Sequence, residues 1–214
     1  MKRTLFIMTM VASSVAATAQ KGNWYVGGVV GYASNTVDVP NSFKTTRSDW
    51  AFGPEAGTFL QDDIQLGLAL GLSGSTIKNN NNKVQSITTV SPTVYIRKFY
   101  KLTDNFSTFA GFYVNYATGT VTDYTPSSAK QTQSGVGLRL GIGIAYALSP
   151  RFTAVGQYGL MGYQTVTTKQ SGTTAETDSG FSFGVNSVGS NTLSQGNGSG
   201  AVFNIGLYYT FIKM

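Results

Sequence analysis

The feature that most constrains this chain is a two-residue alternation of side-chain size, which is clearest between Val136 and Leu148. Every second residue of this stretch is bulky and apolar, whereas the residues between them are glycines, alanines and Arg139. Successive side chains of a β-strand point to opposite faces, so the stretch predicts a strand with one apolar face and one face of small residues. No helical periodicity of comparable length competes after residue 20, and the chain is therefore predicted to be all-β.

The same alternation recurs in eight segments of the chain. They cover residues 23–33, 49–60, 64–75, 86–100, 105–118, a sixth segment that contains 136–148, then 151–164 and 201–211. Each has about 10–15 residues, whereas strands of soluble proteins usually have about five or six. Because a tilted strand crosses a bilayer in about 9–11 residues, these lengths indicate membrane-spanning strands.

Short and long connections alternate strictly between the segments. The short ones are residues 61–63, 101–104 and 149–150, and the long polar ones are 34–48, 76–85, 119–133 and 165–200. An even number of strands then places both chain ends on the side of the short turns, which is typical of a bacterial outer-membrane barrel. Phe181, Phe183 and Val185 alternate inside the last long stretch, which suggests a strand that extends above the membrane.

The alternation alone fits either a soluble barrel with its apolar face inside or a membrane barrel with that face outside. The second face consists of Gly, Ala, Ser and Thr with almost no charges, whereas a soluble surface carries charges at about a quarter to a third of positions. Eight strands also enclose an interior too narrow for eight rows of Leu and Phe. Both observations favour the membrane barrel.

Aromatic residues near the strand ends support the same orientation, because such residues form girdles at the two membrane interfaces. Phe59, Phe99, Phe106 and Phe152 are among the aromatic residues at these ends. The predicted girdle consists of Trp24, Tyr32, Trp50, Tyr100, Tyr116, Tyr146, Tyr209 and Phe211.

The first residues have the composition of a secretory signal peptide. Lys2 and Arg3 precede a short apolar run, and an A-x-A cleavage site ends at Ala19, before Gln20. The apolar run is too short to cross about 30 Å of hydrocarbon as a helix. We therefore expect a signal peptide over residues 1–19 and one outer-membrane barrel domain over residues 20–214. The chain has no Cys, which excludes disulfides and a lipid-modified amino terminus.

Several of these segments resemble a known family. The last strand, NIGLYYTF, resembles the aromatic C-terminal strand that the barrel-assembly machinery recognises, although Ile212, Lys213 and Met214 follow Phe211. FGPEAGTFL, LGLALGLSGS and SPTVYIRKFY resemble the small outer membrane protein β-barrel family of OmpX- and OmpA-like domains in its Bacteroidetes-type form. The resemblance implies an eight-stranded antiparallel up-and-down transmembrane β-barrel. It is specific for the architecture and not for an activity, since this fold carries several functions.

Three charged residues fall on the inward face of strand interiors: Glu55, Arg97 and Arg139. An arginine in the middle of the lipid face would cost about 2–4 kcal/mol, whereas inside the barrel it can be paired. We predict a lumen network of Glu55 with Arg97, and with Arg139 somewhat higher. The supporting residues are Tyr95, Tyr113, Gln157 and Tyr208. Such a network is either a structural plug or a gate, and the narrow interior favours the plug.

The sequence excludes several kinds of chemistry. It contains no His, so Ser–His and Asp–His catalysis are impossible, and the protein is not expected to be an enzyme. Asp62 and Asp63 are interpreted as polar turn residues, and no metal site or cofactor is predicted. After removal of the signal peptide, thirteen Lys and Arg face nine Asp and Glu, an excess too small to indicate nucleic-acid binding.

The function expected from these features is a structural or surface-interaction role, through envelope integrity or adhesion by the extracellular loops. The alternative is a narrow pore for small solutes or ions. The expected partners are outer-membrane lipid and lipopolysaccharide, together with the assembly machinery, and the protein is expected to be a monomer. The near-neutral loops contain no motif that identifies a ligand.

Overall fold

The computed structural model describes residues 21–38, 44–124, 130–170, 175–187 and 204–211, and almost all of them are in antiparallel strands. The strands are β1 (Trp24–Asp38), β2 (Lys44–Gln61), β3 (Ile64–Asn79), β4 (Asn82–Lys101), β5 (Phe106–Asp123), β6 (Lys130–Ala147), β7 (Phe152–Gln170), β8 (Glu176–Ser187) and β9 (Asn204–Phe211). Within this described part, no helix has the length and apolar character needed to cross a membrane.

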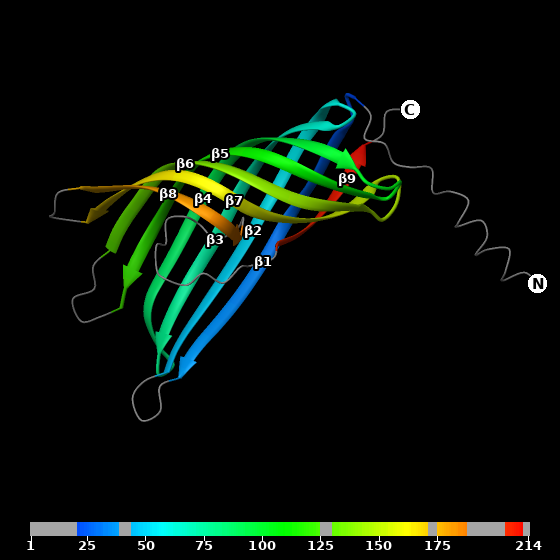
Figure 1. Ribbon diagram of the computed structural model, residues 1–214. Coiled ribbons are helices and arrows are strands. Elements are labelled where there is room, and N and C mark those ends of the chain that lie inside the picture. The colour runs from blue at the N-terminus through cyan, green and yellow to red at the C-terminus, as the bar shows by residue number, and fades with distance from the viewer. Residues whose placement is uncertain (1–20, 39–43, 125–129, 171–174, 188–203, 212–214) are drawn as a thin grey trace, which may run out of the picture.

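The sheet closes on itself as a barrel (Figure 1). Strands β1 to β7 pair in chain order, and β9 lies between β7 and β1. The start of β1 lies beside the end of β9, because Trp24 pairs with Phe211. The ring therefore contains eight strands, as the alternation predicted. Its first strand starts, and its last strand ends, on the side of the short turns.

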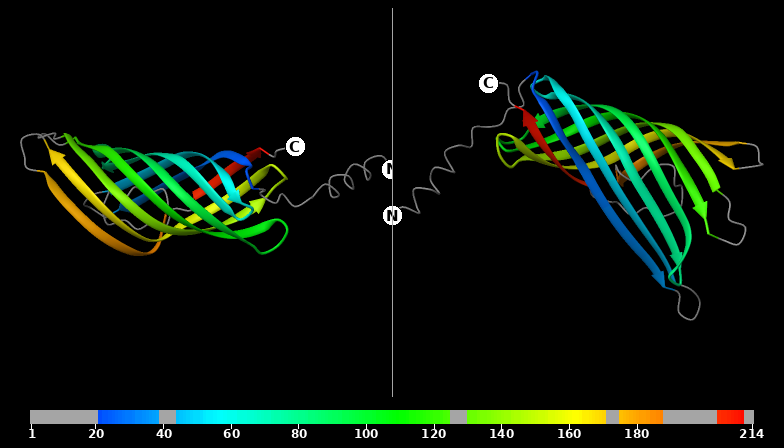
Figure 2. Two further views of the ribbon diagram at one scale, coloured as in Figure 1. Left: turned by 90° about the horizontal axis from the view of Figure 1, so that it is seen from above. Right: turned by 180° about the vertical axis from the view of Figure 1, so that it is seen from behind.

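β8 is an addition to this ring. It pairs with the half of β7 from Tyr158 to Thr168, whereas β9 pairs with the half from Phe152 to Gln157. β9 therefore lies beside β7 at the end with the short turns, and β8 lies beside β7 toward the opposite end. At that opposite end, β1 to β3 diverge from β7 and β8 (Figure 2). The alternation around Phe181 had suggested this strand. Of the predicted eighth strand, residues 201–203 lie outside the described residues.

The strands are longer than predicted, and the interpretation of residues 34–48, 76–85, 119–133 and 165–200 as long loops was wrong for much of their length. Beyond the apolar rows, polar side chains continue the pairing: the hydroxyls of Thr36 and Thr46 are 3.2 Å apart across β1 and β2. A strand surrounded by water needs no apolar face, so the apolar pattern ends before the strand does.

The β3–β4 connection is a two-residue turn in which Asn80 and Asn81 have φ of 46° and 68°, the left-handed conformation that tight hairpins require.

The alternate residues face outward and inward as predicted. The apolar row from Val136 to Leu148 is exposed on the outer surface, whereas Gly137, Gly141 and Gly143 between them are buried. At about 3.3 Å per residue and a tilt of about 45°, this row spans about 28 Å, close to the height of the apolar band of outer-membrane barrels.

The interior is filled by aromatic side chains that lie over inward glycines. Its buried core consists of Tyr25, Phe59, Tyr95, Phe109, Tyr113, Ala145, Val155 and Tyr208. Gly67 lies opposite Tyr95, and a Cβ at this glycine would collide with the hydroxyl of Tyr25 and the phenol group of Tyr95. Gly143 lies opposite Phe109, with the same consequence. At these positions the glycines therefore make room for aromatic side chains rather than for an open channel.

Candidate functional site

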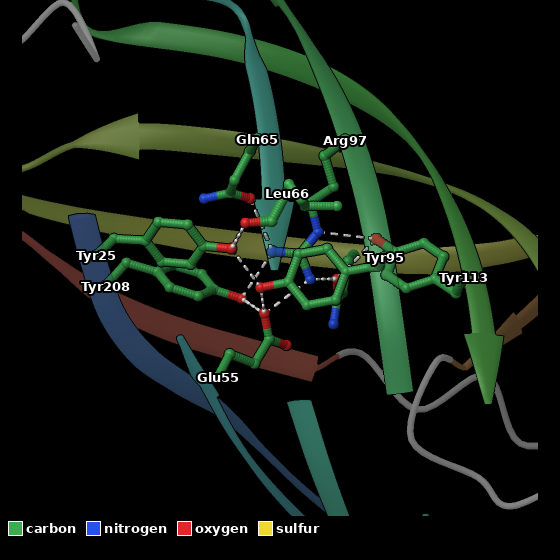
Figure 3. Close-up of polar contacts among 9 residues, drawn as sticks. Tyr25, Glu55, Gln65, Leu66, Tyr95, Arg97, Tyr113 and Tyr208 are labelled. Atoms are coloured by element: carbon green, nitrogen blue, oxygen red, sulfur yellow. Dashed lines mark hydrogen bonds and ion pairs between the residues drawn. The ribbon is translucent and has the colours of Figure 1, made fainter. Parts of the chain in front are cut away.

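The predicted lumen residues gather in one polar layer inside the barrel (Figure 3). The ring of strands brings them together from distant parts of the sequence. Glu55 comes from β2, Tyr95 and Arg97 from β4, Tyr113 from β5, Gln157 from β7 and Tyr208 from β9. Each occupies an inward position in the alternation of its strand. Glu55, Arg97 and Gln157 are buried polar residues that an apolar core would not accommodate without partners, and the three tyrosines add hydroxyl groups.

Arg97 is the centre of this layer, with a relative exposure of 1%. Its guanidinium has five N–H groups, and each of them has an acceptor. Nε donates to Tyr113 at 3.0 Å. Nη1 donates to Gln65 and to Tyr208, each at 3.2 Å. Nη2 donates to Glu55 at 2.9 Å and to Gln157 at 3.2 Å. A buried guanidinium with every donor used is held in one orientation.

Glu55 supplies the compensating charge. Its Oε2 accepts hydrogen bonds from Arg97 Nη2 at 2.9 Å, Tyr95 OH at 2.7 Å and Tyr208 OH at 2.8 Å. The Tyr95 hydroxyl also lies 2.7 Å from that of Tyr25. Removal of one member of such a buried ion pair leaves a charge without compensation, which typically costs about 3–5 kcal/mol.

Aromatic faces complete the surroundings of the two arginines. The Arg97 guanidinium lies 4.0 Å from the ring centre of Tyr95. Arg139, on β6, lies directly opposite Tyr113, on β5. The Arg139 guanidinium is 4.9 Å from the centre of the Tyr113 ring. The structure thus places Arg139 beside the layer, in contact with it through the Tyr113 ring.

Sequence reasoning missed two members of the layer, Tyr25 and Gln65. Gln65 lies directly opposite Arg97 on β3 and is 4% exposed. The phase of the alternation already placed Gln65 on the inward face with Gly67. Gln65 is the second residue of β3, however, directly after a turn. From the sequence alone, its polar side chain could belong either to the turn or to the lumen.

Two cavities flank the polar layer. The cavity on the side of the short turns has a volume of about 450 Å³ and reaches Tyr25, Gln65, Arg97 and Tyr208. The cavity on the opposite side is about 80 Å³ and reaches Glu55, Tyr95, Tyr113, Arg139 and Gln157. The layer therefore forms the common floor of both cavities.

The aromatic residues predicted as a girdle lie at the two ends of the apolar outer surface. Tyr32 pairs with Trp50 across β1 and β2 toward the far end, where Tyr116 is also exposed. Near the short turns, Trp24, Tyr100, Tyr146 and Phe211 are exposed, and Tyr209 packs against Phe152 with ring centres 5.1 Å apart. Phe59 and Phe99 differ from these neighbours, because their inward positions place them in the lumen with ring centres 6.3 Å apart.

Comparison with known proteins agrees with this fold. Residues 4–211 match the family model described as outer membrane protein beta-barrel domain. The solved structure of the outer membrane protein OprG from Pseudomonas aeruginosa is similar with a TM-score of 0.51 and 16% identity, over 91% of this chain and 98% of that one. A search of curated proteins found no match.

Two further structures are less similar. Ail, the attachment invasion locus protein of Yersinia pestis, has a TM-score of 0.46 and 9% identity, over 90% of this chain and 100% of that one. The outer membrane protease OmpT from Escherichia coli has a TM-score of 0.31 and 10% identity, over 89% of this chain and 94% of that one.

The closed antiparallel ring with an apolar outer surface defines a transmembrane β-barrel of the bacterial outer membrane. The family model covers nearly the whole chain, and the chain belongs to the outer membrane β-barrel protein family.

Proposed function

We propose that this protein is a small structural barrel whose lumen is closed by the Arg97 layer and whose extracellular strands form an interaction surface. The observation that carries the proposal is that all five N–H groups of Arg97 are bonded inside a layer contributed by six strands. A side chain held by this many partners moves only if several hydrogen bonds break together, which favours a plug over a frequently opening channel.

The strands beyond the apolar band support the second part of the proposal. Hydroxyl pairs join β7 and β8 at Thr165–Ser179, 3.2 Å, and at Thr167–Thr177, 3.1 Å. On the outer surface of β8, Phe181 is 68% exposed. Paired polar strands give a defined surface rather than a set of loose loops, and such a surface suits adhesion or contact with envelope components.

The proposed partners follow from the outer face. Outer-membrane lipid and lipopolysaccharide would cover the apolar band and its aromatic residues. The aromatic strand β9 would be the segment by which the barrel-assembly machinery receives the chain. A monomer suffices for this role, because the ring pairs its own strands.

Ion conductance tests the closed lumen. We expect purified protein in planar bilayers to give no reproducible single-channel current, whereas Arg97→Ala, which removes the centre of the layer, gives brief openings. The matched control is Lys98→Ala, because Lys98 is the next residue of the same strand and points outward to Asp63. Sizeable, regular currents from the unaltered protein would contradict the proposal.

The two cavities favour one alternative function, a narrow pore. Only the polar layer separates a cavity of about 450 Å³ from one of about 80 Å³, so displacement of this layer would connect them. The conductance measurement distinguishes the two functions directly. An enzymatic role has less support, because a chain without His lacks the usual general base.

A further inference from the structure

The larger cavity, here called the periplasmic vestibule, has the properties of a small-molecule site. It lies between the short turns and the Arg97 layer, and its volume of about 450 Å³ falls in the range of ligand pockets, roughly 300–1,000 Å³. The proposed structural role of the barrel does not need a cavity of this size.

Aromatic and aliphatic side chains form the inner walls of the vestibule. Tyr25, Phe59, Phe99 and Tyr208 line it, together with Ala145 and Val155. The Tyr25 ring meets those of Phe59 and Tyr208 edge-to-face, with centres 5.7 Å and 5.8 Å apart. These contacts hold the rings in place, so the walls are formed before any ligand arrives, and they offer an apolar surface to an aromatic or alicyclic body.

The charge at the inner end of the vestibule is compensated, and two ion pairs lie at its mouth. At the inner end, Arg97 is paired with Glu55 and has used every donor. At the mouth, Lys101 pairs with Asp104 at 3.0 Å, and Lys98 pairs with Asp63 at 3.2 Å.

Asp62, also at the mouth, accepts a hydrogen bond from the backbone N–H of Lys21 at 2.9 Å. The Asp62 carboxylate keeps its charge, but it is exposed at the mouth. An ion that entered the inner vestibule would lose its hydration, and the charges at its inner end, Arg97 and Glu55, are already paired with each other.

We propose that the periplasmic vestibule binds an uncharged, largely apolar small molecule with an aromatic or alicyclic body, taken up from the periplasmic side. Apolar walls stabilise the body of such a ligand, and the polar rim at the turns accommodates a hydroxyl or carbonyl group near the mouth.

Three water-soluble probes with one body and different head groups test this site. They are 4-(trifluoromethyl)benzyl alcohol, the corresponding benzylammonium ion and the corresponding benzoate. Fluorine NMR titrations of each probe use the full barrel in lipid nanodiscs, with empty nanodiscs as the reference for partition into lipid. We expect saturable binding of the alcohol, and affinities at least about tenfold weaker for both ions.

A cavity-filling variant locates the binding. Ala145 lines the vestibule on β6, and Ala145→Leu is expected to weaken binding of the alcohol by at least about tenfold. The matched control is Ala110→Leu, because Ala110 lies on the outer, lipid-facing side of β5 and is exposed. This control should bind like the unaltered protein. Ala147→Leu, at the next inward position of β6, replaces Ala145→Leu if that variant does not fold.

Three results would overturn the inference. They are the absence of saturable binding beyond that of empty nanodiscs, equal affinity for all three head groups, and binding of the alcohol that the Ala145 and Ala147 variants leave unchanged. None of these results depends on whether the barrel conducts ions, so the inference and the proposed plug fail separately.

Discussion

At the scale of single residues, the lumen is organised by one buried charge pair. Arg97 and Glu55 are 1% and 6% exposed. Tyrosine and glutamine side chains accept the other N–H groups of Arg97, and tyrosine hydroxyls donate to Glu55. The cost of burying both charges is offset only when the whole set is complete. A change in one member should therefore cost much more than the loss of one hydrogen bond.

Substitution of Arg97 tests this dependence. We expect Arg97→Met to lower the free energy of unfolding by about 3–5 kcal/mol, because Glu55 remains buried without its counter-charge. Adding Glu55→Gln should recover part of this loss, since no buried charge then remains. The measurement is urea unfolding of the barrel in lipid vesicles. Lys98→Ala, at a half-exposed ion pair, should cost at most about 1 kcal/mol, and equal losses for the two single variants would refute the argument.

At the scale of strands, orientation follows from the contrast between the two faces. On β6, Arg139 lies inside while Leu138 and Leu140 are exposed outside. The fold thus keeps a charge at membrane depth by turning it away from lipid. The same alternation ends at the polar parts of the strands, where hydroxyl pairs take the place of apolar rows.

Arginine substitutions along the outer row of β6 test the depth of the membrane. Ile142 stands at the middle of the row from Val136 to Leu148, so Ile142→Arg should lower the free energy of unfolding by about 2–4 kcal/mol. Leu148→Arg, at the end of the row, should cost about 0–1 kcal/mol. Unfolding in lipid vesicles measures both, and a larger loss at Leu148 than at Ile142 would show that the row is placed wrongly.

The β3–β4 turn provides a second test at this scale. Asn80 and Asn81 both adopt positive φ, which glycine and asparagine accept and β-branched residues do not. Asn81→Gly should leave stability unchanged or raise it slightly, whereas Asn81→Val should cost about 1–2 kcal/mol. Thermal unfolding of the two variants gives the comparison, and equal stability would mean that this turn has another conformation.

At the scale of the whole molecule, the ring closes because β9 joins β7 to β1. This short strand pairs on both sides, so the barrel in this half has no free edge among the described strands. Closure explains how the backbone can cross lipid, where an unpaired N–H or C=O group is expensive.

Closure predicts a characteristic resistance to detergent. We expect the protein to fractionate with the outer membrane, and the unheated protein in SDS to migrate differently from the boiled protein. Gly27→Val should abolish this shift, because a side chain at Gly27 would collide with β9 at Leu207 and Tyr208. Val26→Ala, at the neighbouring outward position, is the control and should retain it. If both variants retain the mobility shift, the close contact of Gly27 with β9 is not needed for closure of the barrel, and the prediction is wrong.

The amino-acid sequence by itself determined the two faces of each strand, the number of strands in the ring and the inward position of Glu55, Arg97 and Arg139. These properties depend on a period of two residues, which is local and can be read along one strand. Only the tertiary structure decided that Gln65 and Tyr25 join the polar layer, that β8 is added beside β7, and that Phe59 and Phe99 line a vestibule. Those features depend on the register and the closure of the ring, which bring together residues far apart in the chain.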